Sequence, residues 1–197
     1  MKEAILLAAG YGSRLKPITD KIPKCLVDIH GVPLLGVWLE QLSKVGVTKF
    51  YINTHYLSAQ VEEFVRQSKF SAMVELFYEE ELLGTAGTLK HILPNVKSSD
   101  LLVVHADNYC ECHWPSFFAS HNRASDIFMS MMLFESDNPQ SCGIVVLDSE
   151  NKIIQFHEKV ALPPSNLANA AIYILNKPLL ITFCENRSTT TKLFLLS

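Results

Sequence analysis

The chain has 197 residues, of which 48% are hydrophobic and 19% are charged, so its composition excludes intrinsic disorder and suits one sizeable core. The formal charge of -3 lacks the basic excess that binding to a nucleic-acid backbone requires, so we expect no nucleic-acid partner. No apolar stretch approaches the roughly 20 residues of a membrane helix, and the cysteines form no CxxC pair, so we expect a soluble, cytoplasmic protein without a membrane partner.

The first half of the chain alternates strand-like and helix-like segments. Apolar runs of strand length occur at residues 4–8, 49–54, 74–78 and 100–106. Segments with helical spacing lie between them at residues 34–45, 59–67 and 86–93. This alternation predicts βαβ units with a parallel sheet. Because several of the strand-like runs are apolar on both faces, we expect helices on both sides of that sheet.

The second half of the chain has a different rhythm. Strand-like runs at residues 126–134, 143–147, 153–156 and 168–175 follow one another with turn residues between the last three. This succession predicts an antiparallel or mixed region that flanks the parallel sheet. We therefore expect an α/β fold with a mixed sheet.

Glycines and cationic side chains lie directly after the first strand. Gly10 and Gly12 allow backbone amides to approach a ligand without obstruction by a Cβ atom, and Arg14, Lys16 and Lys24 bring positive charge to the same loop. The loop is therefore suited to enclosing phosphates, although a glycine-rich turn with solvated basic residues has the same pattern. It lacks the GxxxxGK of a Walker loop and the third glycine of the dinucleotide fingerprint.

The sequence GYGSRLKPIT at residues 10–19, followed by PK at 23–24, resembles the signature of the sugar-1-phosphate nucleotidyltransferases. Three further landmarks of that family follow in order: LGTAG at 83–87, VHAD at 104–107, and FHEK at 156–159 with LAN at 167–169. The LGTAG form most resembles the mannose-1-phosphate guanylyltransferase branch. The resemblance covers about residues 3–175 and implies a Rossmann-like, mainly parallel sheet flanked by helices, with a small antiparallel sugar-binding subregion.

The resemblance also implies roles for individual residues by motif position. Catalytic contacts to the phosphates fall on Arg14 and Lys24. Nucleotide contacts fall on Ala8, Ala9, Gly10, Gly12, Ser13, Glu79, Gly84 and Thr85. Sugar-phosphate contacts fall on Gly143, Glu158, Lys159 and Asn169. Asp107 would bind Mg²⁺, and it follows a strand-like run, where open α/β sheets place their ligands.

The implied reaction joins a nucleoside triphosphate to a sugar 1-phosphate and releases pyrophosphate. We expect one domain over residues 1–197, with a nucleotide-binding half at about 1–110 and a sugar-phosphate-binding half at about 111–197. GTP is favoured because the Glu79 carboxylate suits the N1 and N2 donors of guanine, and mannose 1-phosphate follows from the branch. The second metal-binding Asp of the family would lie beyond residue 197, so we expect a C-terminally truncated chain.

Several alternatives stay open. The enzyme could be a glucose-1-phosphate thymidylyl- or uridylyltransferase, or the chain could be an inactive nucleotide- or sugar-phosphate-binding module of the same fold. Asp107 alone could cap a turn, and Glu158 with Lys159 could be an exposed ion pair. A zinc site at Cys110 and Cys112 with neighbouring histidines is disfavoured by the CxC spacing. Formation of a homo-oligomer is also left open.

Overall fold

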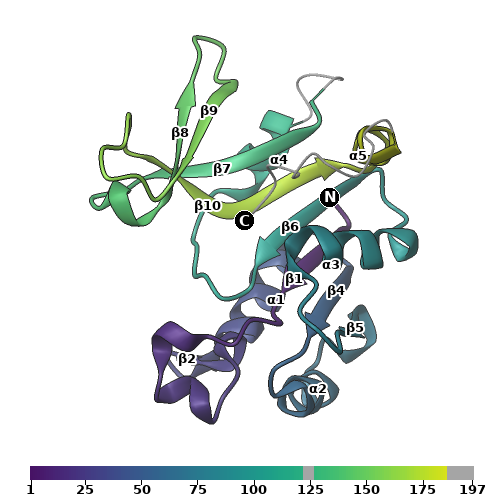
Figure 1. The fold of residues 1–197 in the computed structure, drawn as a ribbon. Coiled ribbons are helices and arrows are strands. Elements are labelled where there is room, and N and C mark those ends of the chain that lie inside the picture. Colours follow the sequence, from purple (N-terminus) through teal and green to yellow (C-terminus); the bar gives the residue numbers. More distant parts are fainter. Residues whose placement is uncertain (122–126, 186–197) are drawn as a thin grey trace.

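The protein is represented by a computed structural model that describes residues 1–121 and 127–185 (Figure 1). Within these residues the main sheet has eight strands in the order β5-β4-β1-β6-β10-β8-β9, with β7 paired to β10. The strands are β1 (Glu3–Leu7), β4 (Lys49–Thr54), β5 (Val74–Tyr78), β6 (Asp100–His105), β7 (Met129–Glu135), β8 (Gly143–Leu147), β9 (Ile153–Glu158) and β10 (Leu167–Asn176). A small separate hairpin pairs β2 (Asp28–Ile29) with β3 (Val32–Pro33).

The sheet is parallel in its first half and antiparallel in its second. Strand β1 pairs in parallel with β4 and β6, and β4 pairs in parallel with β5. The change of direction occurs where β10 pairs antiparallel with β6, and β7, β8 and β9 continue antiparallel beyond it. Strands from both halves of the chain therefore share one sheet, and the predicted mixed α/β fold is confirmed.

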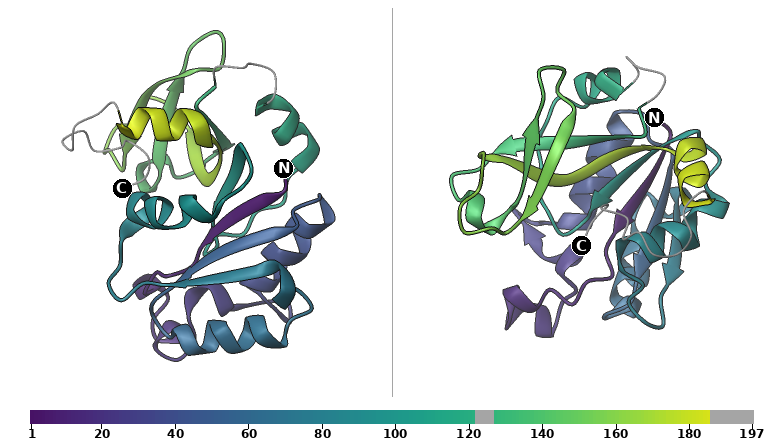
Figure 2. Two further views of the ribbon diagram at one scale, coloured as in Figure 1. Left: turned by 90° about the vertical axis from the view of Figure 1, so that its right-hand side faces the viewer. Right: turned by 45° about the horizontal axis from the view of Figure 1, so that its top comes forward.

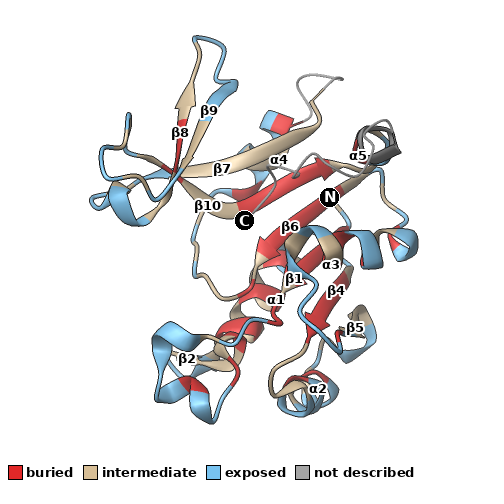
Figure 3. Ribbon diagram, viewed as in Figure 1, coloured by how far each residue is buried: buried red, intermediate tan, exposed pale blue. Residues whose placement is uncertain are grey.

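Helices cover both faces of the parallel part (Figure 2). Helices α1 (Leu34–Lys44), α2 (Ser58–Gln67) and α4 (Trp114–His121) pack on one face, and α3 (Gly84–Ile92) and α5 (Lys177–Glu185) pack on the other. Alternate side chains of each strand enter the two layers, so Leu6 packs toward α1 while Ile5 packs toward α3. Most residues of β1, β4 and β6 are consequently buried, as Figure 3 shows.

Several element ends and two helices differ from the sequence-based expectation. Strand β1 ends at Leu7 rather than at residue 8, because the Ala8 amide leaves the ladder and donates to the Asn53 side chain. Helices α4 and α5 were not expected, since their short sequences have no clear 3.6-residue apolar period. The predicted strand at 126–134 is observed from Met129 onward, and residue 126 and the chain after residue 185 lie outside the described residues.

No helix in the described part of the chain is both long enough and apolar enough to cross a membrane.

Candidate active site

A pocket of about 230 Å³ lies at the carboxyl ends of β1, β4, β5 and β6. Many of the residues singled out in the sequence line it, although they come from separate loops. These are Ala8, Ala9, Gly10, Lys24, Glu79, Gly84, Thr85 and Asp107. Its other lining residues are Leu7, Asn53, Leu82, Thr88 and His105. The fold thus gathers the glycine-rich loop of residues 10–24, the LGTAG loop and the candidate metal ligand around one cavity.

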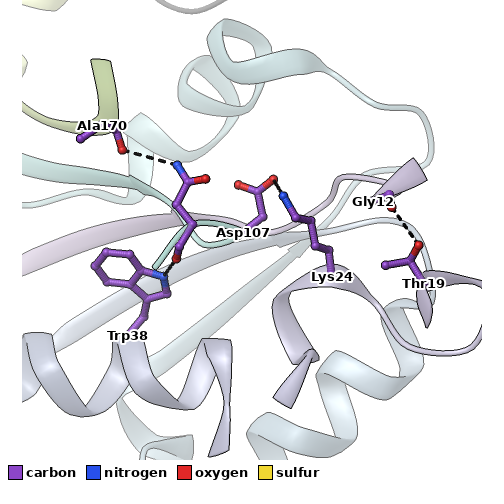
Figure 4. A network of polar contacts seen from close by, with 7 residues as sticks. Gly12, Thr19, Lys24, Trp38, Asp107 and Ala170 are labelled. Atoms are coloured by element: carbon purple, nitrogen blue, oxygen red, sulfur yellow. Dashed lines mark hydrogen bonds and ion pairs between the residues drawn. The ribbon is translucent and has the colours of Figure 1, made fainter. Parts of the chain in front are cut away.

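Lys24 and Asp107 meet inside this pocket. The Lys24 Nζ donates to the Asp107 Oδ2 at 2.8 Å (Figure 4). The lysine side chain is 19% exposed and the aspartate side chain 36% exposed, so the pair is only partly solvated. Lys24 opens a short 3-10 helix whose next residue, Cys25, is buried, and burial raises the pKa of that thiol to about 12. The ion pair therefore rests on a segment anchored in the core.

Gly12 lies where the glycine-rich loop of residues 10–24 folds back on itself. Its φ of 63° lies in the left-handed region, and an added Cβ would lie 2.8 Å from Thr19 Cγ2 and 3.0 Å from Lys24 Cβ. The Thr19 hydroxyl donates to the Gly12 carbonyl at 2.8 Å, which closes the loop (Figure 4). The glycine is needed here for both its conformation and its small volume.

Tyr11, between the two glycines of the motif, is held by a histidine on the neighbouring strand end. The Tyr11 hydroxyl lies 2.9 Å from His55 Nε2, and His55 Nδ1 lies 2.8 Å from the Glu79 carbonyl oxygen. Because a carbonyl oxygen only accepts, Nδ1 carries the proton and Nε2 accepts from the tyrosine. These two hydrogen bonds connect the glycine-rich loop to the loop that follows β5.

A second, buried network joins the same loops. Asn53 accepts a hydrogen bond from the Ala8 amide at 2.8 Å and donates to Glu79 Oε1 at 2.9 Å and to the Thr88 hydroxyl at 3.2 Å. Thr88 in turn donates to the same Glu79 Oε1, while Glu79 Oε2 accepts from the Leu83 amide at 3.2 Å. Asn53, Glu79 and Thr88 are all buried. Glu79 therefore contributes to the pocket wall with Oε1 already satisfied by protein donors, which leaves only Oε2 with acceptor capacity.

Sequence reasoning missed Asn53 and Thr88 as pocket residues, and it noted His105 only within the VHAD landmark and as a neighbour of the disfavoured zinc site. Asn53 was detectable as a polar residue near the end of a strand adjacent to β1. His105 Nε2 is buried without a hydrogen-bond partner among the described residues. Burial lowers the pKa of His105, against the opposing charge of Asp107, so the imidazole is neutral at pH 7.

The remaining predicted site residues lie outside the pocket. Ser13 and Arg14 form part of a short 3-10 helix on the same loop, and both are exposed. Gly143 and Glu158 face each other across β8 and β9, and Lys159 forms an ion pair with Glu158 at 3.3 Å. These three predicted sugar-phosphate residues thus lie outside the pocket, on β8, on β9 and just after β9.

Asn169 lies on β10, next to Ala168, which pairs with Ile144 of β8. The Asn169 side chain donates to the Tyr173 hydroxyl at 2.7 Å and accepts from the Ala171 amide at 2.8 Å, at an irregularity of the strand. The Tyr173 ring contacts the ring of His105, with 6.5 Å between centroids. This contact links the antiparallel region to the pocket.

A second link lies on the other side of Asp107. The Asn108 side chain donates to the Ala170 carbonyl at 3.4 Å, and its own carbonyl accepts from the Trp38 indole at 2.8 Å (Figure 4). The residue after Asp107 therefore touches both β10 and α1. These contacts fix the backbone from which Asp107 projects.

The donor set fits a Mg²⁺ ion that is shared with substrate. Asp107 offers oxygen ligands inside the pocket, and Mg²⁺ is commonly bound by one or two carboxylates together with substrate phosphates. Among the described residues no group of three or more His, Cys, Asp or Glu side chains could hold a metal ion by itself, and this includes the surroundings of Cys110 and Cys112. Asp107 can therefore supply part of a metal site, completed by phosphate oxygens.

Solved structures with a similar fold were found. HddC from Yersinia pseudotuberculosis complexed with GMP-PN is 27% identical, with a TM-score of 0.80 over 99% of this chain and 85% of that one. A putative glucose-1-phosphate thymidylyltransferase from Bacillus anthracis, in complex with a sucrose, is 24% identical with a TM-score of 0.79 over 95% of this chain and 76% of that one. The second likeness shows the fold alone.

Curated relatives and a family match complete the comparison. A putative mannose-1-phosphate guanyltransferase of Sulfolobus acidocaldarius is 32% identical over 91% of this chain and 50% of that protein. A mannose-1-phosphate guanyltransferase of Debaryomyces hansenii is 30% identical over 95% of this chain and 53% of that protein. The chain thus spans about half the length of these curated relatives. Residues 3–195 match the nucleotidyl transferase family, and the chain belongs to that family.

Proposed function

We propose that this protein joins GTP to mannose 1-phosphate, forming a nucleotide sugar and pyrophosphate. A phosphate oxygen of the sugar phosphate forms a bond to the α-phosphorus of the triphosphate, and the bond from that phosphorus to the bridging oxygen of pyrophosphate breaks. The observation that carries the proposal is the pocket in which Lys24, Asp107 and the glycine-rich loop converge at the strand ends.

The chemistry requires positioning and charge compensation more than proton transfer. A phosphate monoester has a second pKa of about 6, so the attacking oxygen is already ionised at neutral pH and needs no general base. Two polyanions must nevertheless be held in contact, and positive groups that compensate the developing charge supply most of the rate enhancement.

Each predicted cation has a place in this scheme. Lys24 would bind the α-phosphate, because its ammonium lies inside the pocket. Arg14, which is exposed on the same loop, would bind the departing pyrophosphate, and Lys159 would bind the sugar phosphate beside Glu158. Asp107 would hold Mg²⁺, which when bound neutralises phosphate charge.

Nucleotide contacts would come mostly from the backbone at both ends of the pocket. Residues 8–13 would enclose the phosphates, while Gly84 and Thr85 begin α3 and would meet the base. Guanine is favoured by the named guanyltransferase relatives and by the neighbour complexed with GMP-PN. The acceptor capacity left at Glu79 Oε2 suits a donor on that base.

A nucleotide- or sugar-phosphate-binding module without turnover is the second candidate. It is favoured because the pocket offers few ligands for a metal ion. In the described chain, Asp107 and the internally bonded Glu79 are the only carboxylates that line it. Binding without pyrophosphate release would identify this case.

Some broader properties are also proposals. Cys25, Cys110, Cys112 and Cys142 are free thiols. They support a reducing compartment, the cytoplasm. We further propose that residues 1–197 act as one domain with a nucleotide half and a sugar-phosphate half, and without a nucleic-acid partner.

The first experiment is a thermal-shift panel with GTP, ATP, CTP, UTP and dTTP, each with Mg²⁺. A ligand that binds the native state raises its melting temperature, so GTP should give the largest increase. A larger shift with UTP or dTTP would contradict the guanine assignment, and no shift with any triphosphate would contradict nucleotide binding.

The second experiment measures pyrophosphate release with GTP and either mannose 1-phosphate or glucose 1-phosphate. Lys24→Ala should lower kcat/KM by about 100-fold or more, as removal of a charge-stabilising contact does elsewhere. Lys21→Ala is the matched control, because Lys21 is exposed and does not line the pocket. Equal losses in the two variants would contradict the role of Lys24.

A further inference from the structure

The protein pairs its candidate phosphate-binding cation with its candidate metal ligand. Lys24 Nζ and Asp107 Oδ2 are 2.8 Å apart, inside the pocket that would receive both the triphosphate and the metal (Figure 4). Within residues 1–121 and 127–185, neither side chain has another ion-pair partner. Each group thus neutralises the other while the pocket holds no substrate.

The two groups cannot keep this pairing when substrates bind. A divalent cation at Asp107 would lie beside the Lys24 ammonium, and like charges about 4 Å apart repel even in water. A triphosphate near Lys24 would likewise lie beside the Asp107 carboxylate. The cation or the triphosphate alone therefore meets a protein group of like charge, whereas both together give each protein group a partner of opposite sign.

The geometry allows this exchange without movement of the loop. The backbone at Lys24 is fixed because the Val27 amide donates to its carbonyl at 3.2 Å and because the next residue, Cys25, is buried in the core. The lysine side chain beyond Cβ is a flexible stem that carries a compact charge. Rotation of this stem moves the ammonium from Asp107 toward a phosphate while η3 (Lys24–Leu26) stays in place.

We propose that the Lys24–Asp107 ion pair forms in the ligand-free protein and breaks when nucleotide and metal bind together. The triphosphate then binds Lys24 and the divalent cation binds Asp107, so each ligand raises the affinity for the other. The inference rests on the proposed function for the identity of the two ligands. It adds that Lys24 competes with the metal in the nucleotide-free protein, although it assists nucleotide binding.

The proposal predicts opposite effects of one substitution on the two ligands. Lys24→Met keeps most of the stem but removes the charge, so Mn²⁺ alone should bind about tenfold more tightly than to the unmodified protein. The same variant should bind GTP with Mg²⁺ at least about tenfold more weakly. Loss of general structural integrity would weaken both, so the divergence is diagnostic.

The test is titration of nucleotide-free protein with Mn²⁺, followed by electron paramagnetic resonance of the free aqueous ion. Unmodified protein, Lys24→Met, Asp107→Asn and the control Lys21→Met are compared. We expect tighter binding in Lys24→Met, no binding at this site in Asp107→Asn, and no change in Lys21→Met. Equal or weaker Mn²⁺ binding in Lys24→Met, or binding that persists in Asp107→Asn, would overturn the proposal. So would Mn²⁺ affinity too low to measure in both the unmodified protein and Lys24→Met.

A complementary measurement uses GTP in the presence of a chelator. Asp107→Asn should bind metal-free GTP more tightly than the unmodified protein does, because Lys24 is released and a repelling carboxylate is removed. Calorimetry gives this affinity directly, and weaker binding would count against the exchange. Failure of the proposed function appears separately, as an unmodified protein that binds no GTP even with Mg²⁺, while the Mn²⁺ titration still reports on the ion pair.

Discussion

The buried network around Asn53 permits a sharp test of how the pocket is assembled. Asn53→Asp keeps the shape of the side chain and still accepts from the Ala8 amide, but it places a carboxylate oxygen 2.9 Å from Glu79 Oε1, where the amide nitrogen now donates. The substitution replaces a hydrogen bond to a charged acceptor with two adjacent buried carboxylates. Such a hydrogen bond contributes about 1.5–3 kcal/mol, and leaving one of its partners unsatisfied costs a similar amount. We expect a loss of about 3–5 kcal/mol in the free energy of unfolding at pH 7, measured by urea denaturation.

The double variant Asn53→Asp/Glu79→Gln provides the control. It exchanges the positions of amide and carboxylate, so the glutamine can donate to the new aspartate while the Ala8 amide keeps its acceptor. We expect it to regain at least about half of the lost stability. A single variant as stable as the unmodified protein, or a double variant no more stable than the single one, would refute the network as the element that joins these loops.

Three further predictions concern the glycine-rich loop, the stability at acid pH and the antiparallel region. Gly12→Ala should lose about 2–3 kcal/mol in urea denaturation because it adds a close contact to a left-handed backbone, whereas Gly31→Ala, also at positive φ but with open space, should lose only about 1; equal losses would contradict this. Burial raises the pKa of Glu3, but the hydrogen bonds that it accepts outweigh burial and hold the pKa below 4.5; this stabilisation is complete above about pH 5 and is lost as the pH falls through the lowered pKa. Glu3→Gln should therefore flatten the fall in the urea midpoint between about pH 5 and pH 3, and an unchanged slope would show that other groups cause it. Gly143→Ala places a Cβ 2.7 Å from Phe156 Cζ and 2.8 Å from Glu158 Oε2, so the Glu158 side chain must shift. KM for the sugar phosphate should therefore rise while KM for GTP stays constant, and a rise in both would point to general disruption.

Local patterns sufficed to predict much of the fold. The runs at 49–54, 74–78 and 143–147 match β4, β5 and β8 residue for residue, since each is an apolar segment of strand length. Helices α4 and α5 escaped prediction because packing of Trp114 and Leu180 into the two core layers, rather than a regular period, determines them. The sequence indicates a helix poorly when its apolar face is short.

The site was predictable only where its chemistry is local. The glycine and lysine pattern of residues 10–24 predicts a phosphate-binding loop without reference to the rest of the chain. The role of Asn53 depends on Ala8, 45 residues away, and on Glu79, 26 residues away, so it emerges only when the strands are aligned side by side. The same network satisfies Glu79 Oε1, which the sequence presented as a free carboxylate for guanine.

The Lys24–Asp107 pair also places a partly buried cation beside a counter-charge in the pocket wall. The Lys24 side chain is 19% exposed, and an unpaired charge in a partly buried place is unfavourable. Asp107 supplies the missing counter-charge, and its backbone is held by Asn108 through contacts to α1 and β10. In the proposed function, the partly buried cation that would bind phosphate is thus neutralised by the carboxylate that would hold the metal. Removing either charge should therefore alter the stability of the protein and its affinities for metal and nucleotide.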